Sequence, residues 1–180
     1  SRYKPEKGKD KRGVTGSDIK KLREISDKIN IIPKEINLHK TISKILDNRR
    51  LTVKNGTGID WSTAESLAFG SLLEEGYPVR LVGQDTGRGT FSQRHSVLRN
   101  QSDNTRYIPL NNISNKQKQF EVVDSFLSEL AVLGFEYGYS LVEPNTLTLW
   151  EAQFGDFANG DQVVIDQFIA SGERKWSRAS

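Results

Sequence analysis

The sequence predicts an α/β fold, a partial and mostly parallel β-sheet with flanking helices, preceded by a basic helical segment. Two observations predict it. From residue 60 onward, segments with helical and with strand patterns alternate along the chain, which is typical of parallel sheets whose strands are joined by helices. Before residue 56 the pattern is helical only, and 16 Lys and Arg residues outnumber 7 Asp and Glu residues, a net charge of +9.

The first of these basic segments is rich in Lys and Gly and contains very few apolar residues. We therefore expect residues 1–16 to form a flexible basic segment. Ser17 is a residue type that caps helices, and it precedes a helix expected over residues 18–30. Leu22 and Ile25 lie on one apolar stripe of that helix, so we expect this face to point inward.

A second helix is expected over residues 38–49, because Pro33 ends the first and the apolar residues then resume helical spacing. Its last turn would carry Arg49 and Arg50, which complement the negative end of a helix dipole. We interpret residues 17–55 as a helical linker region.

The remaining residues carry a net charge of −6, and their patterns predict a sheet. The expected elements are, in order, helix 60–75, strand 79–83, polar loop 84–101, strand 121–123, helix 125–141, strand 146–150 and helix 159–175. The loop 84–101 could also lead into a helix. Open α/β sheets bind ligands beyond the carboxyl ends of their strands. The loops after Val82, Val123 and Trp150 are therefore the expected site.

Several classes of protein are excluded by composition. The chain has no cysteine, which rules out disulfides, thiolate nucleophiles and cysteine metal sites. No apolar run approaches the roughly 20 residues that span a bilayer, and the N-terminus lacks the apolar core of a secretory signal. Since methionine is also absent, we expect that the chain does not begin at its own start codon.

Glu129 is the most informative carboxylate of the chain. On a helix, its neighbours would be Phe126, Val132 and Leu133, and a glutamate on such a face is partly desolvated and suited to proton transfer near neutral pH. The alternative is an exposed glutamate at a helix start, where the helix dipole stabilises it. Spacing alone favours this alternative.

The loop after the first strand contains three glycines in residues 83–91. They would allow the backbone to approach a ligand closely, but the segment matches neither a P-loop nor a dinucleotide fingerprint, and such a turn is more often structural. His95 in this loop is either an acid or base or a hydrogen-bonded loop residue. His39 is far away in the sequence, so we expect no metal site.

Another loop, after the last expected strand, holds two aromatic residues, Phe154 and Phe157. They could stack on a flat ring, or they could anchor the loop to the core, and the pattern slightly favours the second interpretation.

Three segments resemble the signature loops of the thiamine-diphosphate-dependent 2-oxoglutarate dehydrogenases. They are residues 83–95 (GQDTGRGTFSQRH), residues 124–139 (DSFLSELAVLGFEYGY) and residues 150–160 (WEAQFGDFANG), the last of which continues into residues 163–168 (VVIDQF). Their order and spacing also agree with that family, so the resemblance covers about residues 56–178. It implies that residues 56–180 are the N-terminal part of a transketolase-like pyrimidine-binding domain, truncated at its end, with the thiamine-diphosphate-binding fold.

The resemblance also implies roles for single residues. Glu129 would hydrogen-bond a ring nitrogen of the cofactor's aminopyrimidine and control its proton, and Phe157 would stack on that ring. Leu127 and Gln153 would lie beside the ring, and Asp85 would lie near the cofactor at a dimer interface.

His95 and Arg88 are expected close to the substrate, at the entrance of the active site. Position 84 is often acidic in this family, whereas here it is Gln84. This departure puts a proton relay through position 84 in doubt.

The implied activity is oxidative decarboxylation of 2-oxoglutarate with succinyl transfer to a lipoyl group, a step of the tricarboxylic acid cycle. The cofactors would be thiamine diphosphate and Mg²⁺, with metal ligands outside this chain, so the chain alone is expected to be inactive. The partners would be a second copy of the full-length enzyme, the dihydrolipoyl succinyltransferase and the dihydrolipoyl dehydrogenase. The location would be the bacterial cytoplasm or the mitochondrial matrix, with no binding to nucleic acid or membrane.

Two alternatives remain open at this point. The basic N-terminal third could belong to a nucleic-acid-binding module, since phosphate neutralisation needs clustered Lys and Arg, although Tyr3 is its only aromatic residue. The chain could also be part of a non-catalytic paralogue that holds a complex together.

Overall fold

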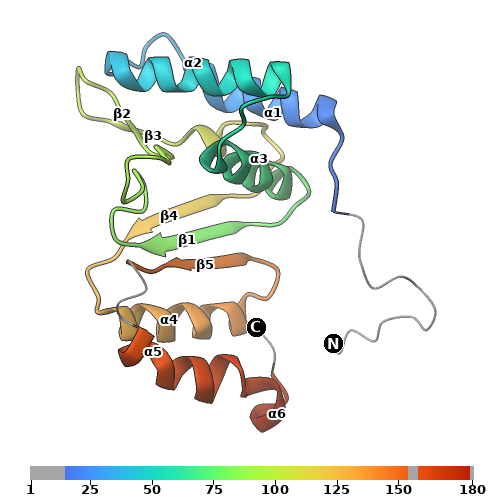
Figure 1. The fold of residues 1–180 in the computed structure, drawn as a ribbon, viewed down its shortest axis with the longest axis vertical. Coiled ribbons are helices and arrows are strands. Elements are labelled where there is room, and N and C mark those ends of the chain that lie inside the picture. Colours follow the sequence, from blue (N-terminus) through green and yellow to red (C-terminus); the bar gives the residue numbers. More distant parts are fainter. Residues whose placement is uncertain (1–14, 154–157, 179–180) are drawn as a thin grey trace, which may run out of the picture.

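Three parallel strands lie at the centre of the structure, a computed structural model that describes residues 15–153 and 158–178. The middle strand is β1 (Val79–Gly83), with β4 (Phe120–Asp124) on one side and β5 (Leu147–Glu151) on the other. Both pairings are parallel along the whole of β1. The expected α/β class with a parallel sheet is thereby confirmed (Figure 1).

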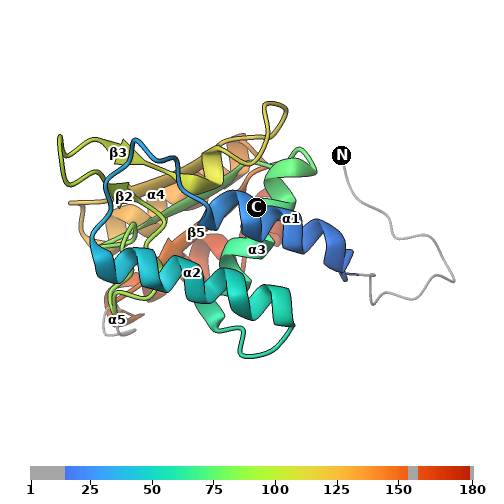
Figure 2. The same cartoon turned by 90° about the horizontal axis from the view of Figure 1, so that it is seen from above.

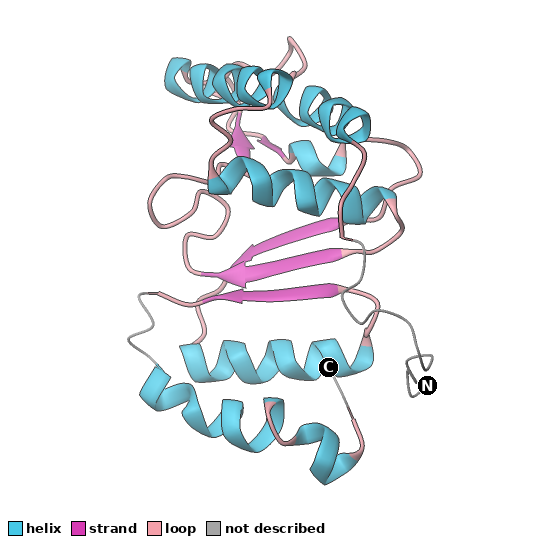
Figure 3. Ribbon diagram, turned by 45° about the vertical axis from the view of Figure 1, so that its right-hand side comes forward, coloured by secondary structure: helices cyan, strands magenta, loops and turns pink. Residues whose placement is uncertain are grey.

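Helices cover both faces of this sheet, so the structure has helix, sheet and helix layers (Figure 3). On one side of the sheet lies α3 (Trp61–Glu74), and α1 (Ile19–Asn30) and α2 (Lys40–Asn55) form a further layer beyond it, in front in the view of Figure 2. The other is covered by α4 (Glu129–Val142), followed by α5 (Ala158–Val164), the π-helical turn η2 (Ile165–Ile169) and α6 (Gly172–Trp176). Between β1 and β4 the chain forms β2 (Leu98–Arg99), β3 (Arg106–Tyr107) and the 3-10 turn η1 (Pro109–Asn111).

The main core lies between the sheet and helices α1 to α3. Alternate residues of the strands face it, because side chains of a strand point to opposite faces in turn, and the rings of Phe69 and Phe120 lie 5.7 Å apart at its centre. The basic N-terminal helices contribute to the same core through Ile25, Ile29 and Val53. Both helices of the N-terminal third therefore pack into the body of the fold.

Two expectations for these helices were wrong. The N-cap of α1 is Asp18 and not Ser17, and the Asp18 carboxylate accepts a hydrogen bond of 2.9 Å from the Lys20 amide. Helix α2 runs beyond residue 49 to Asn55 and ends at Gly56, whose φ of 73° suits a glycine. Arg49 and Arg50 therefore lie in the middle of α2, so they do not complement its C-terminal dipole.

Three further expectations fail after β1. The segment 84–97 contains no helix and leads into β2. The helix expected from residue 125 begins only at Glu129, because Ser128 caps it. The helix expected over residues 159–175 is interrupted by η2, whose wider turns change the direction of the side chains. Of its apolar residues, Val164 is buried, whereas Val163, Phe168 and Ile169 are exposed.

Gly70 offers a test of how α3 packs against α1. A Cβ atom at Gly70 would lie only 2.6 Å from Ile25 Cγ2. Gly70→Ala should therefore lower the free energy of unfolding by about 1–3 kcal/mol, the usual effect of overpacking. Gly134→Ala is the matched control, since nothing lies within 4 Å of a Cβ there, and it should be neutral or stabilising by up to about 1 kcal/mol. Equal effects in urea denaturation would contradict this packing.

Candidate active site

The loop formed by residues 84–97 lies across the carboxyl edge of the sheet, where ligands are expected. It begins at the end of β1 and is tied to the end of β4, because the Gly87 amide donates to Asp124 Oδ1 at 3.2 Å. It closes on itself, since the amide of Ser96 donates to the Gly87 carbonyl at 2.8 Å. This edge lies on the left in Figure 1, and it also carries the N-terminus of α4.

Arg94 fixes this loop to two other elements. Its Nε lies 2.6 Å from Glu65 Oε1 on α3, and its Nη1 donates to Glu151 Oε1 at the end of β5 at 3.0 Å and to the Thr86 carbonyl at 2.8 Å. The residue is 4% exposed. Burial alone would lower the pKa of Arg94, but the hydrogen bonds and charges of Glu151 and Glu65 raise it. Arg94 is therefore a buried, charged residue that connects the loop to α3 and β5.

Glycines at the end of β1 and within the loop allow close contacts inside the protein itself. A Cβ atom on Gly83 would lie 2.6 Å from Thr86 Oγ1 and 2.7 Å from the Glu151 carbonyl oxygen. Gly89 has a φ of 83°, which glycine adopts without strain. The close contacts at Gly83 and the backbone conformation of Gly89 therefore agree with the structural interpretation of the glycine-rich turn.

Two of the predicted site residues have left-handed backbone conformations. Asp85 has a φ of 52° and His95 a φ of 50°. This conformation is uncommon for residues other than glycine, although Asp and His adopt it more readily than most, and unusual backbone conformations concentrate at functional sites. The surrounding contacts must therefore hold both residues in place.

Glu129 is the first residue of α4, where the helix dipole favours a carboxylate. It is half-buried, and its Oε1 accepts a hydrogen bond of 2.9 Å from Gln84 Nε2. Val132 and Leu133 are buried as expected, but Phe126 precedes the helix and is fully exposed. The helix-start interpretation of Glu129 therefore describes its position, and Phe126 is no neighbour on a helical face.

Gln153 connects to the same group of side chains. Its Nε2 donates to the Gln84 carbonyl at 3.0 Å and to Thr90 Oγ1 at 2.8 Å. Leu127 lies just before α4 and is 53% exposed. The structure thus brings Gln153 and Glu129 together through Gln84. Phe154 and Phe157 lie outside the described residues.

His95 and Arg88 line a cavity of about 630 Å³ beside this group. Burial lowers the pKa of His95, the charges of Arg49 and Arg88 lower it further, and a hydrogen bond with the Ser92 backbone opposes them. An uncharged imidazole near neutral pH follows. The cavity is also lined by Arg99 and Arg106, which sequence reasoning did not single out, and by His39, which lies far from His95 in the sequence.

Asp85 does not line this cavity. It forms an exposed ion pair of 3.0 Å with Arg88. It lies in the same loop as His95 and therefore at the same edge of the sheet.

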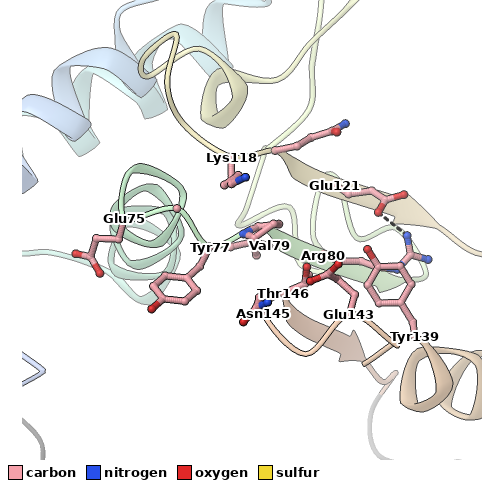
Figure 4. A pocket seen from close by; sticks show the side chains of 13 residues that line it. Glu75, Tyr77, Val79, Arg80, Lys118, Glu121, Tyr139, Glu143, Asn145 and Thr146 are labelled. Atoms are coloured by element: carbon pink, nitrogen blue, oxygen red, sulfur yellow. Dashed lines mark ion pairs between the residues drawn. The ribbon is translucent and has the colours of Figure 1, made fainter. Parts of the chain in front are cut away.

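A second cavity, of about 620 Å³, lies at the opposite end of the strands (Figure 4). Arg80 and Glu121 line it and form an ion pair of 2.6 Å, and the Arg80 guanidinium lies 4.7 Å from the centre of the Tyr139 ring. Arg80 also pairs with Glu136 on α4 at 2.7 Å. Because parallel sheets bind ligands at their carboxyl ends, this cavity is the weaker candidate for a catalytic site.

Asp161 is a buried carboxyl group that sequence reasoning missed. It lies in α5, is 1% exposed, and neither of its carboxylate oxygens has a hydrogen-bond partner among the residues that the structure describes. Burial raises the pKa of Asp161, and the charge of Glu129 raises it further. The helical pattern of residues 159–175 contained no signal that this aspartate faces inward.

The described residues, 15–153 and 158–178, include no helix with the length and hydrophobicity that a bilayer-spanning segment requires. Within the same ranges, no three or more His, Asp or Glu side chains gather in a way that could hold a metal ion.

Replacing Arg94 tests how much its buried ion pairs with Glu65 and Glu151 stabilise the fold. Arg94→Met would leave Glu65 and Glu151 without their cation, so the free energy of unfolding should fall by about 3–5 kcal/mol. Adding Glu151→Gln should recover part of this loss. In the control Arg88→Met, only an exposed ion pair is lost, and the change should stay below about 1 kcal/mol. Similar losses in free energy of unfolding for Arg94→Met and Arg88→Met, measured by denaturant unfolding, would contradict this role of the buried ion pairs.

Asp161→Asn should stabilise the protein in a pH-dependent way. Since the pKa of Asp161 is raised in the folded state, the folded protein binds this proton more tightly than the unfolded chain. The wild type therefore loses stability as the pH rises from its ordinary pKa through its folded pKa. The free energy of unfolding of the variant should exceed that of the wild type at pH 7, and this difference should be smaller near pH 4.5. A difference in free energy of unfolding that is the same at both pH values would disprove the raised pKa of Asp161.

Comparison with known proteins agrees with this geometry. Residues 57–180 match the model of the family described as transketolase, pyrimidine binding domain. The chain is 61% identical over 170 residues, 94% of its length, to the 2-oxoglutarate dehydrogenase E1 components of Brucella canis and Brucella abortus. It is also 61% identical over 168 residues to that of Brucella ovis.

These relatives are much longer proteins, and this chain spans 17% of their length. The family match covers the three parallel strands, the loop across their carboxyl ends and the helix that begins with Glu129. The chain therefore belongs to the transketolase pyrimidine-binding domain family.

Proposed function

We propose that the protein containing this chain is a thiamine-diphosphate-dependent 2-oxoglutarate dehydrogenase. It decarboxylates 2-oxoglutarate and transfers the succinyl group to a lipoyl group of dihydrolipoyl succinyltransferase. The names of the relatives support this proposal. The observation that carries it is the position of Glu129, at the start of a helix beyond the carboxyl edge of the sheet.

Glu129 is the proposed partner of the cofactor's aminopyrimidine. When bound, thiamine diphosphate supplies the electron sink for decarboxylation of a 2-oxo acid, while the protein orients groups and places protons. The donor set fits, because Glu129 Oε1 already accepts a hydrogen bond from an amide N–H of Gln84, the same type of donor as a protonated ring nitrogen. Gln84 is neutral, so we propose that proton transfer runs through Glu129 and not through position 84.

The side chains around Glu129 are proposed to position the ring. Gln153 is held by Gln84 and Thr90, which supports a fixed polar contact beside the aminopyrimidine. Leu127 offers an exposed apolar side chain next to Glu129, which suits contact with a flat ring. We propose the stacking role for Phe157 from the family resemblance alone.

His95 and Arg88 are proposed to bind the substrate. They line one cavity together with Arg99 and Arg106, and this positive lining suits an anion with two carboxylates. Asp85 is proposed to lie near the cofactor, in the strained loop that carries both residues.

The assembly of the whole enzyme is also a proposal. Mg²⁺ would be bound by residues outside this chain, which spans 17% of its relatives. The exposed apolar side chains of Phe126, Leu127 and Leu130 support a contact with a second copy of the enzyme. The further partner would be dihydrolipoyl dehydrogenase. The bacterial relatives favour the bacterial cytoplasm over the mitochondrial matrix.

The alternatives have less support. The N-terminal helices pack apolar side chains into the core of the sheet, which is not expected of a separate nucleic-acid-binding arm. The 61% identity to 2-oxoglutarate dehydrogenase E1 components favours a catalytic protein over a non-catalytic paralogue.

Glu129→Gln in the full-length enzyme tests the proposal. Because the amide cannot exchange a proton with the ring nitrogen, decarboxylation of 2-oxoglutarate should fall by about 10²–10⁴-fold, with the melting temperature little changed. Glu143→Gln is the control, since Glu143 lies at the other end of α4, and it should keep its activity. Near-normal turnover by Glu129→Gln would disprove the role of Glu129.

A further inference from the structure

Arg49 is a buried arginine in the middle of α2, 6% exposed. Its Nη1 donates to the carbonyl oxygen of Arg94 at 3.0 Å, and its Nη2 donates to the carbonyl oxygen of Gln93 and to Ser62 Oγ, the latter at 2.9 Å. The Ser62 hydroxyl donates to the same Gln93 carbonyl at 2.5 Å. The guanidinium is therefore directed at the backbone immediately before His95.

This use of a buried charge is unusual. No carboxylate of the described residues lies within ion-pair distance of Arg49, and its nearest acidic groups, Asp60 and Glu65, act at longer range. Burying a charge is costly unless polar groups replace water. The two carbonyl oxygens and the Ser62 hydroxyl supply that replacement for the two terminal nitrogens, whereas Arg49 Nε has no hydrogen-bond partner among the described residues. Two of the three partners are the backbone carbonyls of residues 93 and 94.

The residue that follows this backbone is strained. His95 has a φ of 50°, and its side chain lines the cavity next to Arg88. Arg94 fixes the loop from one side through its side chain, and Arg49 fixes the Arg94 carbonyl from the other. The strained conformation of His95 lies directly after this doubly held peptide.

We propose that Arg49 is a positioning residue of the active site, which holds the Gln93–Arg94 backbone so that His95 is presented to the substrate cavity. Helix α2 is then part of the catalytic apparatus. This inference rests on the proposed function, in which His95 contacts the substrate. It predicts that Arg49 affects the use of 2-oxoglutarate more than the binding of thiamine diphosphate, because Glu129 lies on a different element.

The test compares Arg49→Met, Arg49→Lys and Arg50→Met in the full-length enzyme. Arg50 is the matched control, since it lies on the same helix, is exposed and pairs with Asp27 at 2.8 Å. The measurements are kcat and KM for 2-oxoglutarate over a range of pH, thiamine diphosphate affinity by fluorescence titration, and hydrogen exchange of residues 84–97.

For Arg49→Met, kcat/KM should fall about 10–100-fold, the usual effect of misplacing a group near the substrate. Losing the Arg49 charge raises the pKa of His95, so the acidic limb of the kcat/KM profile should move to higher pH. Arg49→Lys keeps the charge but cannot bridge both carbonyls, so it should restore the acidic limb and only part of kcat/KM. Arg50→Met should match the wild type within about twofold, as expected for an exposed ion pair. Thiamine diphosphate affinity should not change in any variant.

The inference is overturned if Arg49→Met keeps the wild-type pH profile and hydrogen exchange, or if Arg50→Met shows the same changes. If Arg49→Met does not fold, Arg49→Lys decides, and full wild-type kcat/KM in that variant overturns the inference. Failure of the proposed function looks different, because the wild-type enzyme would then not decarboxylate 2-oxoglutarate. Hydrogen exchange of residues 84–97 would still report whether Arg49 holds the loop.

Discussion

The ion pairs of Arg94 with Glu65 and Glu151 are the constraint on which the candidate site depends. They join the loop after β1 to helix α3 and to the end of β5, which are far apart in the sequence. Removing one partner of a buried ion pair strongly destabilises the folded protein. The ion pairs of Arg94 therefore hold the loop, α3 and β5 together. The strained backbone at Asp85 and His95 requires a frame of this kind.

Glu129 depends on a different constraint, the direction of the parallel strands. Because β4 ends at the carboxyl edge of the sheet, α4 must start there, and its positive end lies beside the loop after β1. The carboxylate is stabilised by the helix start and held by Gln84. The nearby Asp161, buried and without a hydrogen-bond partner in the described part of the chain, adds electrostatic repulsion to this region. Glu129 and His95 thus lie at one edge of the sheet but are held by different contacts. The α4 start and Gln84 position Glu129, whereas Arg94 holds the loop that carries His95.

Sequence reasoning predicted the sheet well, because alternating strands and helices leave a strong periodic signal, and it predicted the edge at which Glu129, Gln153 and His95 gather. It failed where tertiary contacts decide. The sequence predicts Arg49 as a cation at a helix end, since nothing in it shows that residues 93 and 94 pass beside Arg49. Asp161 lies on a helix whose apolar pattern η2 interrupts. Long-range hydrogen bonds to backbone carbonyls leave no pattern in the local sequence, so the role of Arg49 required the structure.

The most direct measurement is a crystal structure of the full-length protein with thiamine diphosphate and Mg²⁺ bound. The account predicts a Glu129 carboxylate oxygen at hydrogen-bond distance, about 2.6–3.2 Å, from a ring nitrogen of the aminopyrimidine, with the Gln84 amide displaced from Glu129 or sharing it. A cofactor whose aminopyrimidine contacts another carboxyl group, while Glu129 remains bound to Gln84 alone, would contradict the account.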